Sequence, residues 1–178
     1  MTFSTPAFLF FAVIALCFAA SCEQAVPRNK FIDEINAAKV RARNLQEQAE
    51  RKLTQARERA ESGDRAAHEE LIEEAAQLYG QTSDALNEAV KNANEMTKVK
   101  SPEWYKEYFS LHSKLIDNLS QLASGAQVEL LVRKNRTPTD AEVQSWRENM
   151  NRIRKDNAEY QRQISAIEAR QGIKLITE

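Results

Sequence analysis

The chain has 178 residues, with 25 lysines and arginines against 26 aspartates and glutamates, and a net charge of −1. This balance provides no sustained basic patch and argues against a nucleic-acid partner. No CxxC pair, Cys/His metal framework, Gly-rich phosphate loop or nucleophile elbow is present in the sequence. We therefore expect a non-catalytic protein that has no cofactor and no metal.

The first 22 residues carry no charged side chain, and every lysine, arginine, aspartate and glutamate lies beyond them. Residues 7–20 form a run of apolar and small side chains (AFLFFAVIALCFAA). Such a run, followed by small residues, is typical of a secretory signal, and it is shorter than the roughly 20 residues that span a bilayer. The sequence therefore predicts that residues 1–21 are a signal peptide and that the protein is exported.

The segment AASC (19–22) resembles the lipobox of bacterial lipoproteins, with Ala19 where that family usually has leucine. The resemblance implies that Cys22 is lipidated and holds the protein at a cell membrane or outer membrane. Glu23 after the cysteine implies outer-membrane sorting. Two alternatives stay open: cleavage at an A-x-A-like site, which would release a soluble secreted protein, and an uncleaved anchor. Because Cys17 lies inside the signal, the mature chain would contain Cys22 alone and no intramolecular disulfide.

After the lipidated cysteine and a short linker (22–27), we expect one helical domain (28–178). Gly63 interrupts the first long periodic segment, and Gly172 is placed to end the last one. Together with the other turn signals, these glycines predict helices over 28–61, 65–98, 102–135 and 139–171.

The beginnings of the last two helices carry capping signals. Ser101 is placed as the N-cap of the third helix, with Pro102 at its first helical position. Thr139 and Glu142 form a capping box that opens the fourth.

Apolar residues recur in steps of three and four along all four segments, and in the second and third segments the stripe is broader than a strict two-stranded seam. Each helix would be about 50 Å long at 1.5 Å per residue. Equal lengths and short connections predict an all-α, antiparallel up-down-up-down four-helix bundle with long helices of about equal length. A long dimeric coiled-coil hairpin is the alternative, and self-association is compatible with either. The stripe of the fourth helix consists of Val143, Trp146, Met150, Ile153, Asn157, Tyr160, Ile164 and Ile167.

Thr82 and Asn157 occupy core-type positions at nearly the same height in this bundle, and Gly80 lies nearby. One interpretation is a buried polar layer that fixes the register of the helices. The other is a small ligand pocket at mid-bundle, for which Gly80 would leave space.

Four aromatic residues, Trp104, Tyr105, Tyr108 and Phe109, cover more than half of the circumference of the third helix. The predicted topology places them at the end of the bundle nearest the amino terminus. They would either pack that end of the core or contact lipid headgroups or a partner protein.

The histidines His68 and His112 fall about 30 Å apart in an antiparallel bundle, too far to share a metal ion.

Taken together, these features favour a membrane-anchored cell-envelope lipoprotein that acts as a structural or protein-interaction module. The alternative is a periplasmic or extracellular ligand-binding or sensing bundle with its site at mid-bundle.

Overall fold

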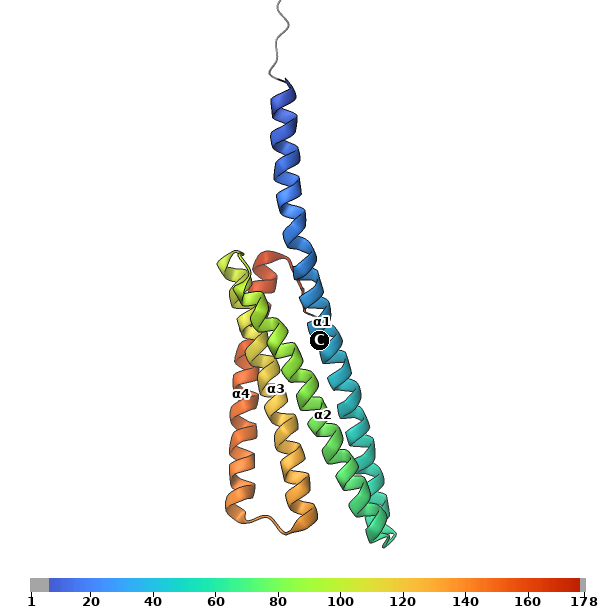
Figure 1. Cartoon of the computed structure of the whole chain (residues 1–178). Helices are drawn as coiled ribbons and strands as arrows, with labels where there is room; N and C mark the ends of the chain where they lie inside the picture. Colours follow the sequence, from blue (N-terminus) through green and yellow to red (C-terminus); the bar gives the residue numbers. More distant parts are fainter. Residues whose placement is uncertain (1–6, 177–178) are drawn as a thin grey trace, which may run out of the picture.

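The computed structural model describes the backbone of residues 7–176 and the side chains of residues 30–176. The described chain is all-α and consists of α1 (Ala7–Glu61), α2 (Arg65–Lys98), α3 (Glu103–Asn135) and α4 (Asp140–Gln171), joined by short connections (Figure 1). The predicted four-helix architecture is confirmed. The first helix extends beyond the predicted bounds, because it continues without a break through residues 7–27.

Local signals place most helix ends as the sequence predicted. Thr139 and Glu142 form the full capping box, and Gly172 adopts the left-handed conformation (φ 63°) that ends α4. The third helix differs from the prediction by one residue. Pro102 is its N-cap and, because proline has no polar side chain, it gives no side-chain cap. The Ser101 hydroxyl, which was expected to cap this helix, donates to the Val99 carbonyl.

Buried alanines line the interface between α1 and α2, and their small side chains let the two backbones approach closely. Two ion pairs flank this seam, Arg41 with Glu88 at 3.1 Å and Lys52 with Glu74 at 2.6 Å. The seam residues are Ala38, Ala42, Ala49 and Ala56 from α1 and Ala75, Ala85, Ala89 and Ala93 from α2.

Small polar side chains join α2 to α3. Ser83 Oγ lies 2.8 Å from Ser120 Oγ, which donates to Asn87 Oδ1 at 2.8 Å. Nearer the other end of the interface, Ser113 donates to Asn94 Oδ1, also at 2.8 Å. A one-turn slip would separate these partners and leave buried hydroxyls unpaired, so the pairs fix the register of the two helices.

The fourth helix packs against α3 but not against α1, so one side of the bundle is open among the described helices. Figure 1 shows the helices in the order α4, α3, α2, α1 across the molecule, with α3 and α4 diverging toward the connection between them. The predicted core stripe of α4 is correspondingly too long. Only Ile153, Ile164 and Ile167 are buried, whereas Met150 is 39% exposed.

The chain beyond Gly172 turns back and crosses from α4 to α1 (Figure 1). Tyr108 Oη accepts hydrogen bonds from the backbone N–H groups of Leu175 (3.3 Å) and Ile176 (3.1 Å). Asn36 on α1 donates to the Leu175 carbonyl at 3.4 Å, and Ile176 is 1% exposed. This C-terminal segment, residues 173–176, therefore ties α4 to α1 at the end of the bundle where α1 enters, which we call the proximal end.

Candidate binding groove between α1 and α4

The structure does not join the two residues of the predicted polar layer. Thr82 is 2% exposed, and its hydroxyl donates to the Leu78 carbonyl of its own helix at 2.8 Å. Asn157 instead accepts a hydrogen bond from Asn118 Nδ2 on α3, also at 2.8 Å. The two residues line different pockets. Their equal height in the bundle did not reveal that they lie on different sides of α3.

Gly80 does not open space for a ligand, in contrast to the sequence-based interpretation. A Cβ at this position would lie 2.7 Å from Nε2 of Gln127, so the side chain of that glutamine already occupies the space.

We expect Gly80→Ala to raise the free energy of unfolding by about 0.5–1 kcal/mol, because alanine favours the helix and the end of the Gln127 side chain can move aside. Urea denaturation measures the effect. Gly125→Ala is the matched control, since a Cβ at Gly125 meets nothing within 4 Å. If Gly80→Ala destabilises the protein while Gly125→Ala stabilises it, Gln127 is held rigidly and the expectation is wrong.

The aromatic cluster belongs to the core and does not form a contact surface. Tyr105 is 7% exposed, and Tyr108 and Phe109 are fully buried, so these three side chains are not available to a membrane or a partner. Trp104 is partly buried and packs edge-on against Tyr105, with ring centroids 5.5 Å apart. Aromatic side chains cover this much of the helix because α1, α2, α4 and the C-terminal segment all reach the proximal core.

A pocket of about 510 Å³, the proximal pocket, lies where α1 and α4 fail to meet. Helix α3 forms its floor, and the C-terminal segment closes one end. Its apolar lining consists of Leu115, Ile116, Leu119, Ile164 and Ile176, and its polar lining of Lys39, Arg43, His112, Asn157, Gln161, Ser165, Glu168 and Lys174.

His112 is the unusual group of the proximal pocket. It is 5% exposed, and neither ring nitrogen has a hydrogen-bond partner within the described part of the chain. Its ring stacks edge-on against Tyr108, with centroids 4.5 Å apart. Burial, with a smaller contribution from the positive charge of Lys39, lowers the pKa of His112 to about 3. The imidazole is therefore neutral at physiological pH and offers one N–H donor and one acceptor.

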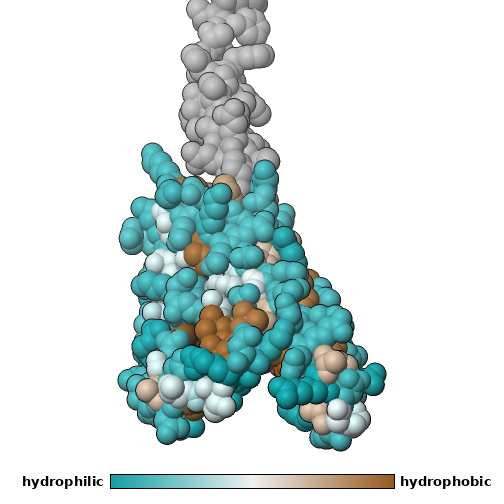
Figure 2. Space-filling model, turned by 60° about the horizontal axis from the view of Figure 1, so that its bottom comes forward, coloured by the Kyte–Doolittle hydropathy of each residue, from teal (hydrophilic) through white to brown (hydrophobic). Residues whose placement is uncertain are grey.

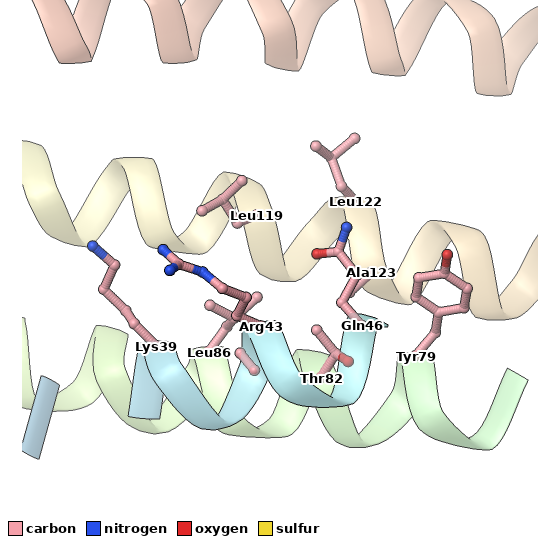
Figure 3. A pocket seen from close by; sticks show the side chains of 10 residues that line it. Lys39, Arg43, Gln46, Tyr79, Thr82, Leu86, Leu119, Leu122 and Ala123 are labelled. Carbon is pink, nitrogen blue, oxygen red and sulfur yellow. The ribbon is translucent and has the colours of Figure 1, made fainter. Parts of the chain in front are cut away.

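A second pocket of about 280 Å³, the distal pocket, continues the first one toward the Gly63 turn. It shares Lys39, Arg43 and Leu119 with the proximal pocket, so the two form one groove along the α3 floor. Figure 3 shows Lys39, Arg43 and Gln46 extending from α1, and Leu122 pointing from α3 toward α4. The remaining lining residues are Ala42, Tyr79, Thr82, Leu86, Leu122 and Ala123.

The groove has a positively charged rim. Among the described residues that line it, three side chains are cationic, Lys39, Arg43 and Lys174, and one is a carboxylate, that of Glu168. The carboxylate is partly engaged, since Tyr108 Oη donates to Glu168 Oε1 at 3.1 Å. Arg43 is exposed and makes no ion pair or hydrogen bond with another described residue. The rim can therefore attract an anion, while the floor is apolar.

The pocket interpretation from the sequence named two residues that line this groove, Thr82 in the distal pocket and Asn157 in the proximal pocket. It did not identify the cationic rim, although one signal for the rim was present. Lys39 and Arg43 are four residues apart on the same helix face, and like charges at this spacing destabilise a helix slightly. Such a pair is a reason to look for an anion. Nothing in the sequence could show that α4 leaves this face of α1 uncovered.

The histidines and acidic side chains of the described residues do not form a metal site. No group of three or more metal-ligating side chains occurs among them, and His68 Nδ1 lies 2.9 Å from the Ala56 carbonyl of the neighbouring helix. Among the same residues, no helix has both the length and the apolar character needed to cross a bilayer. Cys22 lies outside the residues whose side chains the structure describes.

Comparison of the chain with protein-family models, with curated proteins and with solved structures found no match.

Proposed function

We propose that this protein is an exported lipoprotein, held at a cell-envelope membrane through a lipid on Cys22, whose bundle is a non-catalytic ligand-binding module. Of the two functions that the sequence leaves open, ligand binding is favoured by one observation. The open side of the bundle holds a groove with an apolar floor, a cationic rim and an unpartnered buried histidine, His112. Binding sites of small molecules typically combine an apolar lining with a few polar groups in a cavity of about 300–1,000 Å³.

A structural or protein-interaction role is the second candidate. Large apolar side chains are exposed on the half of α3 and α4 nearest their connection, where Figure 2 shows an apolar patch beside a cleft between the two hairpin tips. Patches of this kind can mark protein contacts. The exposed side chains are Val128, Leu131 and Met150.

The anchor is tested by metabolic labelling with an alkyne analogue of palmitate in a bacterial host, followed by membrane fractionation. We expect Cys22→Ala to abolish labelling and to remove the protein from the lipid-anchored fraction. Cys17→Ala is the matched control and should label like the parent chain, because Cys17 lies inside the predicted signal peptide. Equal labelling of the Cys22→Ala variant would rule out the anchor.

A further inference from the structure

We infer that the groove between α1 and α4 binds an amphipathic organic anion, with a single apolar chain on the α3 floor and an acidic head at Lys39 and Arg43. This inference deepens the proposed function and rests on its ligand-binding part, but it does not depend on the lipid anchor.

The charge and its position define the head of the ligand. Lys39 and Arg43 line both pockets and lie at the junction between them. Without a partner among the described side chains, the Arg43 guanidinium keeps all its donors available to an oxyanion. An acidic head placed at this junction would face two cations. Glu168, which is the one carboxylate among the described lining residues, already accepts a hydrogen bond from Tyr108.

The floor defines the rest of the ligand. Leucine and isoleucine side chains of α3 and α4 line the proximal pocket, and Leu119 continues this surface into the distal pocket. Leu119 is 37% exposed, so a bound apolar chain would cover surface that water now reaches. Burial of apolar area contributes about 25 cal/mol per Å². A small hydrophilic anion would gain nothing from this floor, which favours an amphiphile.

His112 adds a polar group close to the proposed head, since it lines the same pocket as Lys39, whose positive charge acts on its ring. An unpartnered buried imidazole costs free energy, and a ligand that brings an acceptor or a donor to it recovers that cost. A purely apolar ligand would leave both ring nitrogens of His112 without a hydrogen-bond partner. His112 therefore supports a ligand with polar atoms near its head.

The experiment uses the full chain in lipid nanodiscs and a photoactivatable diazirine analogue of laurate, with mass spectrometry to locate the labelled peptides. We expect labelling on α3 and α4 around residues 112–122 and 157–164. Excess laurate or dodecyl phosphate should compete, which tests whether the acidic head is a carboxylate, a phosphate or either. Dodecanol and dodecyltrimethylammonium, which lack the negative charge, should compete at least tenfold less well.

Two pairs of variants test the two halves of the ligand. Arg43→Gln should weaken labelling about tenfold, the loss expected for one charge-assisted hydrogen bond. Arg154→Gln is its control, because Arg154 is exposed, has no partner among the described residues and lies outside both pockets. Leu119→Glu should abolish labelling, whereas Val128→Glu, at an exposed apolar site on the same helix outside both pockets, should not.

A second measurement follows the histidines by NMR of the ¹³C-histidine-labelled protein. Laurate should shift the His112 ring resonance and leave that of His68, which lines neither pocket, unchanged. The inference is overturned if labelling is confined to residues 7–29, if dodecanol competes as well as laurate, or if Arg43→Gln and Arg154→Gln behave alike. A labelled groove together with an unlipidated Cys22 would leave the inference standing and reject only the anchor.

Discussion

Replacing Tyr108 with phenylalanine is expected to lower the free energy of unfolding by about 2–3 kcal/mol and to release the C-terminal segment. The Tyr108 hydroxyl accepts the backbone N–H groups of Leu175 and Ile176 and donates to Glu168. Its removal leaves two N–H groups without an acceptor, and each buried unsatisfied donor costs about 1–3 kcal/mol. Burial of the phenol raises the pKa of Tyr108 to about 12, with a contribution from the Glu168 carboxylate, so the hydroxyl stays protonated and all three hydrogen bonds persist at neutral pH.

Urea denaturation gives the stability change, and hydrogen exchange of the amides of residues 173–176 reports the release of the segment. Tyr160→Phe is the matched control, because Tyr160 is partly buried and makes no hydrogen bond with another described residue. Unchanged exchange of residues 173–176 in Tyr108→Phe would show that the hydroxyl does not hold the segment. Because Ile176 and Lys174 line the proximal pocket, the same variant should weaken laurate labelling.

The second large effect is a pH dependence that comes from His112. Burial lowers its pKa from about 6.5 to about 3, so below pH 6.5 the unfolded chain takes up a proton that the folded chain does not. Stability is therefore lost progressively as the pH falls from 6.5 toward 3. Each unit of pKa difference corresponds to about 1.4 kcal/mol, so the loss attributable to His112 at pH 4.5 is about 2–3 kcal/mol.

The variant His112→Leu isolates this contribution. We expect it to be as stable as the parent chain or more stable at pH 7.5, since leucine removes two unpartnered nitrogens from the core. The difference in free energy of unfolding between His112→Leu and the parent chain should increase by about 2–3 kcal/mol, in favour of the variant, between pH 7.5 and pH 4.5. Between pH 7.5 and pH 9 this difference should stay constant, because the imidazole is neutral in both the folded and the unfolded parent chain. A constant difference down to pH 4.5 would show that the histidine is hydrated or paired in the folded protein.

Most helix bounds were predictable because they depend on local signals, whereas the predicted start of the first helix at residue 28 was wrong, since α1 begins at Ala7. The capping box at Thr139 and the left-handed Gly172 act within one turn of the chain, so their effect can be read from neighbouring residues. The buried alanines of α1 also recur at helical spacing, so they mark the face that packs on α2. The predicted N-cap of the third helix was wrong. The Ser101 hydroxyl donates to the Val99 carbonyl, and Pro102 is the N-cap.

The groove was less predictable, because it depends on which faces of the helices meet. The periodicity of α4 marks an apolar stripe, but only its isoleucines find partners, on α3 and in the proximal core. Thr82 and Asn157 were both recognised as polar residues at core-type positions. They do not pair with each other: Thr82 donates to the Leu78 carbonyl, and Asn157 accepts from Asn118. The sequence around each residue does not show which of the possible hydrogen-bond partners it will have.

The sequence by itself determined that this protein is a set of four long helices with defined ends, because helical period and capping are properties of contiguous residues. Only the tertiary structure decided that α4 packs on α3 alone and leaves a groove beside α1. That outcome depends on long-range contacts: the buried isoleucines of α4 pack on α3 and in the proximal core, and Tyr108 holds the C-terminal segment that crosses to α1. Lys39, Arg43 and His112 line the groove that remains, which gives the bundle its candidate site.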